Sequence, residues 1–457
     1  MLPVHLEFRP ERDADLFAAV PAAPAVFLLR ASDPQSEPYV SKTASLRRRL
    51  IRLLGPIEAR TRKLNLRDRV AVIEYAPTGS DFESGFVLYK TLRALFPNTY
   101  EDRLRLRPAP LARFRLENRY PRVSITTHLG SAKSVYYGPF PSRAAAEKFA
   151  SDALDFFKIR RCVEELNPDP AFPGCVYSEM KMCLAPCFKG CTDEQYGAEV
   201  ARVETFLDSR GRSLVREISA ARDQASAGLE FETAAAMHAQ LEKLKPVVSQ
   251  LPEIVHRLDR LAGLMIQPSS QPDTVTFFRI QSGCLSDPIT FTIKRLDDAV
   301  GPGASPAGAT TPGLNNVGPG ASPGLPASSP QSYRAAGAQS GSPARADFAR
   351  DGVTVARGKK IPHSMESRVA EALAAAPTSS CSRQETMEHL AILKRWYFRS
   401  SKLGEIFFAE ENGELPMRRI VRGISRVFRG EKPAADLSET ARDYWINRGR
   451  EAELGKD

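Results

Sequence analysis

Apolar and polar residues in the N-terminal hundred positions repeat with two periods, which together predict a small α/β module. Short apolar runs bounded by turn-forming residues indicate strands at 25–29, 39–40 and 70–75. Four leucines recur at the spacing of one helix face, with arginines on the other face. These leucines are Leu46, Leu50, Leu53 and Leu54. A basic helix packed on a sheet is therefore expected within residues 20–100.

A second helix in this module is predicted from its N-terminal signature. Ser80-x-x-Glu83 is a capping box, in which the serine and glutamate side chains satisfy backbone N–H groups of the first turn. Farther along the chain, the pattern predicts a strand pair at 123–127 and 134–137 and an amphipathic helix at about 143–157.

Helical periodicity returns after residue 193. Helices are expected at about 194–208, 212–226 and 230–249, and a strand pair at 274–280 and 289–293. The last two helices each carry an apolar stripe, which is too little surface to stabilise an isolated helix pair. The partner of these stripes is either the rest of the chain or a hairpin of another protein. His238, on the second stripe, is expected to be a packed core residue.

Composition changes abruptly after these elements. Residues 300–346 are dominated by Gly, Ala, Ser and Pro and contain VGPGASP twice, which predicts a disordered linker. A C-terminal helix is expected at about 383–399, with an apolar face formed by Met387, Leu390, Leu393, Trp396 and Tyr397. The pattern therefore predicts an α+β chain of six regions, at 20–100, 101–192, 193–250, 251–298, 299–350 and 351–457.

The chain has 457 residues and a net charge of +10, most of which lies in one segment. Residues 42–69 hold ten basic and two acidic residues. A surface this one-sided is typical of proteins that bind a phosphate backbone, although a solvated helix face is the plainer interpretation. The side chains expected to contact DNA are Lys42, Arg47, Arg48, Arg49 and Arg52.

Membrane and secreted proteins are disfavoured by the sequence. The longest apolar stretch, 18–29, has 12 residues, whereas a membrane span needs about 20. The N-terminus also lacks a basic-then-apolar leader. The chain has seven cysteines, and an odd number argues against a scaffold built from disulfides. A cytoplasmic protein with no membrane partner is expected.

Five of the seven cysteines fall within a short segment: Cys162, Cys175, Cys183, Cys187 and Cys191. Thiolates gathered in this way can surround a zinc ion or an iron–sulfur cluster. The paired short spacings of most zinc sites are missing, but the spacing alone does not choose between the two metals. Reduced, free cysteines are the remaining interpretation.

Several motifs in collinear order resemble the UvrC family, the excision-repair nuclease subunits. They are PAVF at 24–27, YVSK at 39–42, YYGPFPS at 136–142, the cysteine segment and LEFETAA at 229–235. The resemblance runs from about residue 20 to residue 295. It implies a GIY-YIG nuclease domain for the 3′ incision, a four-cysteine module with a [4Fe–4S] cluster, and a UVR helical hairpin that docks onto a UvrB-type protein.

The resemblance also implies that the nuclease centre is degenerate. Tyr39, Lys42 and Arg49 match the family positions that orient the attacking water and the scissile phosphate. The positions that depart from the family are Phe27, Ser41, Leu53 and Leu88. Leu88 replaces a metal-binding glutamate, and Glu83 is rotated off the same helix face. Hydrolysis that depends on magnesium therefore lacks an oxygen ligand.

The other two modules match the family more closely. The resemblance assigns the cluster to Cys162, Cys175, Cys183 and Cys187, with zinc as the alternative and Cys191 as an additional thiol. In the hairpin, the residues expected to contact the partner are Phe231, Glu232, Ala235 and Leu241.

The RNase H-like and helix-hairpin-helix domains of the family, which serve the 5′ incision, are not expected after residue 295. The sequence therefore predicts a nucleotide excision repair protein that binds damaged duplex DNA and a UvrB-type partner, with an impaired 3′ nuclease. Two alternatives remain. One is an active, magnesium-dependent endonuclease with an altered metal site, and the other is an iron–sulfur interaction module without a DNA role.

Overall fold

The computed structural model describes residues 2–56, 64–130, 133–293, 364–377, 380–410 and 412–431. These ranges belong to one unit that is built from both ends of the chain, residues 1–294 and 363–457. The predicted linker at 299–350 lies outside the described residues. None of the helices in the described ranges combines the length and the apolar character that a membrane span requires.

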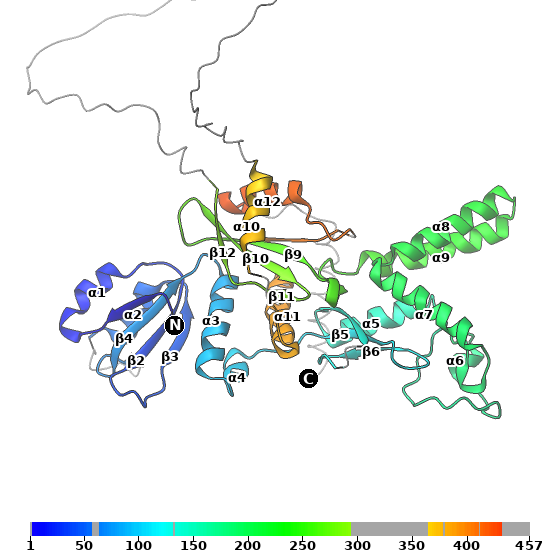
Figure 1. Ribbon diagram of the computed structural model, residues 1–457, viewed down its shortest axis with the longest axis horizontal. Helices are drawn as coiled ribbons and strands as arrows, with labels where there is room; N and C mark the ends of the chain where they lie inside the picture. Colours follow the sequence, from blue (N-terminus) through cyan, green and yellow to red (C-terminus); the bar gives the residue numbers. More distant parts are fainter. Residues whose placement is uncertain are drawn as a thin grey trace, which may run out of the picture. The chain divides into compact units, whose positions relative to one another are not determined.

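The first sheet is antiparallel, with the strand order β1-β4-β2-β3 (Figure 1). Its strands are β1 Val4–Glu7, β2 Ala25–Ala31, β3 Tyr39–Thr43 and β4 Val70–Pro77. The three predicted strands are confirmed, whereas β1 and the helix α1 (Asp13–Ala19) were missed. β1 is short and half-exposed, and its pairing partner β4 lies far along the chain, so no local pattern marked it.

Two helices cover opposite faces of this sheet: α2 (Leu46–Leu54) and α3 (Asp81–Leu95). The four leucines of α2 are buried against Phe27 and Leu29, which confirms the predicted helix. α3 packs Leu88 against Val26 and Leu28. Since successive strand residues point to opposite faces, odd-numbered β2 residues face α2 and even-numbered ones face α3.

The predicted capping box at the start of α3 is present only in part, because the Glu83 side chain bonds to Gly79 and not to the backbone N–H of the N-cap residue Ser80. Ser80 Oγ accepts the backbone N–H of Glu83 at 3.0 Å, and Glu83 Oε2 accepts the backbone N–H of Gly79 at 2.7 Å. These two bonds satisfy donors that a helix N-terminus leaves free. The glutamate of this motif is therefore committed to the start of its own helix.

The second sheet has the strand order β6-β5-β7-β8. Its strands are β5 Leu111–Arg115, β6 Val123–Thr126, β7 Ser134–Gly138 and β8 His256–Arg257. β6 and β7 both exist as predicted, but they do not pair with each other, because β5 lies between them. Arg113 and Arg115 alternate with apolar residues in β5, a pattern typical of a half-buried strand, and this short strand was missed. Beside this sheet lie α5 (Arg143–Leu154) and α7 (Asp193–Asp208).

The third sheet joins the N-terminal and C-terminal parts of the chain, with the order β11-β10-β9-β13 and β12 beside β10. Its strands are β9 Gly263–Pro268, β10 Thr274–Gln281, β11 Cys284–Leu285, β12 Ile289–Thr292 and β13 Glu405–Phe408. The predicted pair is confirmed as β10 and β12. β13 pairs with β9, so the regions predicted at 251–298 and 351–457 share one sheet.

Helices cover both faces of the third sheet (Figure 1). On one face lie α10 (Met365–Ala375) and α12 (Met417–Arg429), and on the other lie α11 (Arg383–Tyr397) and the second side of α3. The five residues predicted as the apolar face of α11 are all buried. Shorter or separate helices are α4 Tyr100–Leu104, α6 Val176–Glu179, α8 Arg212–Ala227 and α9 Phe231–Ser249.

Candidate functional site

Tyr39 in β3 and Arg49 in α2 meet on the α2 face of the first sheet. A guanidinium N–H of Arg49 donates to Tyr39 Oη at 2.8 Å. The ring of Phe27 lies 6.0 Å from the Tyr39 ring, and both Phe27 and Leu53 are buried. Arg49 Nε is also buried and has no hydrogen-bond acceptor among the described residues. Two of the three predicted catalytic residues are therefore together, beside apolar replacements; Ser41 is paired in register with Phe27.

Lys42 lies on the opposite face of the same strand. It is paired in register with Val26, which belongs to the cluster on the α3 face. Its ammonium group forms an ion pair with Asp81, and Asp81 also pairs with Arg399. Since residues three apart in a strand point to opposite faces, the structure separates Lys42 from the tyrosine–arginine pair. Leu88 lies on the Lys42 side.

The two carboxylates at the start of α3 have opposite environments. Burial raises the pKa of Asp81, but its contacts with Lys42 and Arg399 outweigh burial and leave the pKa below its usual value. Burial raises the pKa of Glu83, and the hydrogen bond from Gly79 offsets this only in part. Asp81 is therefore held as an anion between two cations, and Glu83 is held as a buried helix cap.

The five basic residues predicted to contact DNA differ in how they are used. The Arg47 guanidinium donates to the carbonyls of Val20 and Ala18, at 2.8 and 3.1 Å, and so caps the end of α1. Lys42 and Arg49 have the partners described above. Arg48 and Arg52 are exposed and lie one turn apart on α2, so they share a face. Only this pair presents its charge outward.

The cysteine segment lies between α5 and α7. Burial, and then the charge of the thiols of Cys162, Cys187 and Cys175, raises the pKa of Cys183 to about 11. Among the described residues, the side chains gathered at metal-binding distance do not include these four cysteines. Burial, and then the charges of Asp193 and Cys187, raises the pKa of Cys191.

The backbone of this segment is shaped around its sulfur atoms. Ala185 donates its N–H to Cys183 Sγ at 3.3 Å, and Cys175 Sγ accepts an N–H from the first turn of α6. Lys181, Ala185 and Lys189 all have positive φ, a conformation that costs about 1–3 kcal/mol outside glycine and that gathers at ligand clamps. The segment has the donors and the turns that suit a thiolate site.

The hairpin formed by α8 and α9 exposes most of its predicted partner surface. The side chain of Phe231 is 68% exposed, and Glu232 and Ala235 are exposed as well. Leu241 is 5% exposed and belongs to the buried core, so it is not available to a partner. The prediction of a packed His238 was wrong, because the face that carries it is not covered and the residue is exposed.

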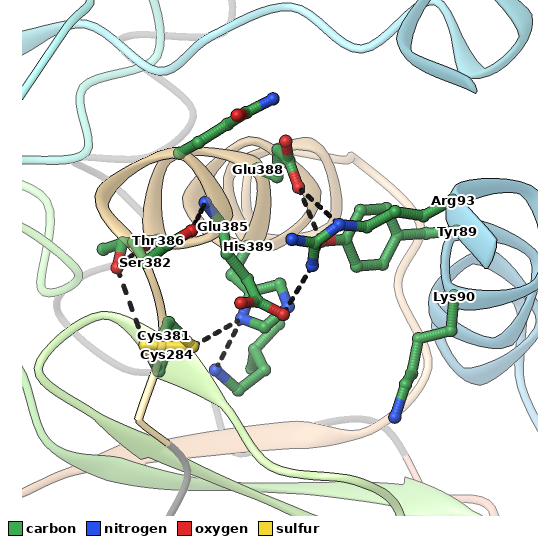
Figure 2. A network of polar contacts seen from close by, with 12 residues as sticks. Tyr89, Lys90, Arg93, Cys284, Cys381, Ser382, Glu385, Thr386, Glu388 and His389 are labelled. Atoms are coloured by element: carbon green, nitrogen blue, oxygen red, sulfur yellow. Dashed lines mark hydrogen bonds and ion pairs between the residues drawn. A yellow bond between two sulfur atoms is a disulfide. The ribbon is translucent and has the colours of Figure 1, made fainter. Parts of the chain in front are cut away.

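A polar network that the sequence did not predict joins α3 to α11 (Figure 2) and also includes Tyr100 of α4. Glu388 is buried and accepts hydrogen bonds from Tyr89, at 2.6 Å, and from Tyr100, at 2.5 Å. Arg93 pairs with Glu385 at 2.5 Å. The partners lie about 290 residues apart in sequence, so no motif connects them.

Near this network, Cys284 and Cys381 form a disulfide, while the five cysteines of 162–191 are free.

The described residues form an α+β protein with antiparallel sheets and a cysteine-rich segment, and comparisons with known proteins show what part of it is similar to. The family model "UvrC/Cho excinuclease, middle domain" matches residues 111–206, from β5 to α7 and including the cysteine segment. No solved structure matches the chain.

Curated relatives named "UvrABC system protein C" match about half of this chain. The Pseudomonas fluorescens protein is 30% identical over 233 residues, which are 51% of this chain and 38% of the relative. The Alcanivorax borkumensis protein is 30% identical over 210 residues, 46% of this chain and 34% of the relative. The Idiomarina loihiensis protein is 28% identical over 217 residues, which are 45% of this chain and 34% of the relative. The match thus covers little more than a third of each relative, and over that part the chain is similar to proteins of the UvrC family.

We predict that Asp81→Asn and Glu83→Gln change the pH dependence of stability in opposite directions. The lowered pKa of Asp81 means that its carboxylate stabilises the fold above the unfolded-state pKa, and that this contribution is lost as the pH falls through the folded-state pKa. Asp81→Asn should therefore cost up to about 1 kcal/mol at pH 7, because the pair is half-exposed, and almost nothing in strong acid.

The raised pKa of Glu83 has the reverse sign, because its contribution is present below the unfolded-state pKa and is lost as the pH rises through the folded-state pKa. Glu83→Gln should therefore gain stability relative to wild type as the pH rises from 4 to 7. Urea unfolding across a pH series measures both slopes. Equal slopes in the two variants would contradict the assigned environments.

Proposed function

We propose that this protein is a UvrC-like component of nucleotide excision repair, which binds damaged duplex DNA and a UvrB-type protein and has an impaired 3′-incision centre. The observation that carries this proposal is the Tyr39–Arg49 pair, which retains phosphate-binding groups beside apolar Phe27 and Leu53. Within the described ranges, the cluster of three metal-ligating side chains lies elsewhere, at Cys284, Cys381 and His389.

The impairment follows from the chemistry of phosphodiester hydrolysis. The reaction needs a cation to neutralise charge on the phosphate and the leaving oxygen, and magnesium takes oxygen ligands in near-octahedral geometry. Asp81 is occupied by Lys42 and Arg399, and Glu83 caps its own helix. Leu88 offers no oxygen. The remaining groups suit recognition of a phosphate better than its hydrolysis.

Two surfaces support the binding roles. Arg48 and Arg52 direct two positive charges away from α2, and phosphate contacts of this kind supply much of the affinity for DNA. On the hairpin, Phe231 exposes an aromatic ring next to Glu232 and Ala235. An exposed aromatic side chain is the usual anchor of a protein interface, and this position corresponds to the UVR module of the resemblance.

The cysteine segment fits a [4Fe–4S] cluster held by Cys162, Cys175, Cys183 and Cys187, with zinc as the alternative. The fit rests on the backbone N–H donors to Cys183 and Cys175 and on the left-handed turns between the cysteines. A bound cluster would supply a rigid cross-link for a segment that has little regular structure of its own. The surrounding residues orient the thiols and shield them from solvent.

An active magnesium-dependent endonuclease is the second candidate, and one observation favours it. Arg49 Nε is buried beside Tyr39 and has no acceptor among the described residues. A phosphate oxygen of a substrate would satisfy this donor. In that case the Tyr39 hydroxyl, already bonded to Arg49, would lie next to the scissile phosphate.

Replacing Arg48 and Arg52 together by alanine is expected to weaken duplex binding and to lower the slope of log K against log salt by about two, since each phosphate contact contributes about 0.9. Fluorescence anisotropy at several salt concentrations measures the slope. Arg216→Ala with Lys243→Ala, which removes two exposed charges from the hairpin, is the matched control. An unchanged slope in the α2 variant would refute the DNA assignment.

Phe231→Ala is expected to weaken binding of a purified UvrB-type protein at least about tenfold, as for an interface anchor. Its thermal unfolding should stay at the wild-type temperature, because the side chain is 68% exposed. Lys243→Ala, exposed farther along α9, should bind normally. Surface plasmon resonance measures the affinities, and equal affinity of Phe231→Ala and wild type would remove the hairpin from the interface.

An incision assay with damaged duplex, magnesium and the partner proteins tests the impaired centre directly. We expect no nicking above the protein-free control, while gel shifts under the same conditions still report binding. Nicking that disappears in Tyr39→Phe and in Arg49→Ala would instead establish the endonuclease. Loss of both binding and nicking would contradict the two DNA-based functions and leave an interaction module.

A further inference from the structure

Three metal-ligating side chains converge away from the cysteine segment and the Tyr39–Arg49 pair. Cys284 lies in β11, Cys381 lies just before α11, and His389 lies in α11. Their ligand atoms are all within 4.8 Å of one another (Figure 2). Cys284 and His389 are buried, and Cys381 is half-buried. The matched family domain ends at residue 206, so it does not include this group.

The imidazole of His389 is prepared as a ligand. Its Nδ1 accepts the backbone N–H of Leu285 at 3.1 Å, so this nitrogen carries no proton and holds a lone pair. The same atom lies 3.6 Å from Cys381 Sγ. Zinc–sulfur and zinc–nitrogen bonds of about 2.3 and 2.0 Å at a tetrahedral angle give a sulfur–nitrogen separation of about 3.5 Å. The sulfur and the nitrogen already have the spacing that a shared zinc ion requires.

The two sulfur atoms require a change of redox state. They are joined as a disulfide, with the Cα atoms 6.1 Å apart. Two thiolates on one zinc ion stand about 3.8 Å apart, which a disulfide does not permit. Disulfides are rare in reducing compartments, where a dithiol such as thioredoxin keeps cysteines reduced.

We propose that the reduced chain binds a zinc-class divalent ion through Cys284, Cys381 and His389, and that the disulfide is the metal-free, oxidised form of this site. Reduction by a dithiol adds two electrons and two protons and leaves two thiols. Metal binding then releases the two thiol protons as the thiolates form. The fourth position falls to a water or to the Thr386 hydroxyl, which lies 3.6 Å from Cys284 Sγ.

The site has one evident cost and one evident effect. The ion takes the His389 lone pair that now accepts the Leu285 N–H. The Leu285 N–H must then donate to a thiolate instead or remain without a hydrogen bond. In return, the ion joins β11 to α11 across a sequence separation of 97 residues. His389 also packs on Phe86 and Tyr89 of α3, at 5.4 and 5.5 Å between rings, so the ion would brace the contact between α11 and α3.

Metal counting on the full chain tests the proposal without relying on DNA binding or nicking. The chain is purified under a phosphine reductant, loaded with zinc, desalted and analysed by mass spectrometry of the metal. Because the cysteines of 162–191 can also hold metal, the readout is a difference between variants. Cys381→Ser and His389→Gln should each lose about one equivalent relative to wild type. Cys191→Ser and His238→Gln, which keep the three ligands, should lose none.

Oxidation supplies the second arm. Treatment with a thiol oxidant should release the same equivalent from wild type and none from Cys381→Ser. Added zinc should raise the melting temperature of the reduced wild type more than that of His389→Gln, which reports on the site even if Cys381→Ser folds poorly. Equal metal content in wild type and His389→Gln under reducing conditions would overturn the proposal and leave a disulfide only.

Discussion

Helix α3 packs against sheets on two sides, and this constraint decides which side chains its faces can carry. One side packs Leu88 against the first sheet. The other side packs Phe82 and Phe86 against Phe278 of the third sheet, at 4.9 and 5.7 Å between ring centroids. Leu88 is partly buried and packs against the apolar cluster of the first sheet, and an unpaired carboxylate among these apolar side chains would be costly. Packing therefore accounts for an apolar residue at this position.

The polar groups of α3 obey the same constraint. Each has a fixed partner: Asp81 lies between Lys42 and Arg399, and the Tyr89 hydroxyl donates to buried Glu388. Burial, and then the Glu388 carboxylate, raises the pKa of Tyr89, so the phenol stays protonated and keeps donating. Leaving either buried partner unsatisfied would cost about 1–3 kcal/mol. The network therefore fixes the position of α11 on α3 with a specificity that apolar contacts alone would not give.

Local signals in the sequence identified the elements that depend on local contacts. The N-cap role of Ser80 and the buried face of α11 were predicted correctly because a helix end and a helix face are encoded within a few residues. β1 and β13 were missed because each is defined by a partner strand far along the chain, whereas β5 pairs with the next two strands and was missed although it lies nearby. The separation of Lys42 from Tyr39 could have been predicted, since strand residues three apart face opposite ways. The partners of Asp81 and Glu388 could not have been predicted, because tertiary contacts between distant parts of the chain determine them.

The two groups of cysteines show the same division between local and long-range information. Spacing alone drew attention to the segment at 162–191, because its turns are built within 30 residues. Cys284 and Cys381 are separated by a stretch that carries no recognisable metal motif, and only the pairing of β13 with β9 and the packing of α11 bring them together. These are also the contacts that cover the second side of α3. The C-terminal region thus completes the third sheet and encloses α3.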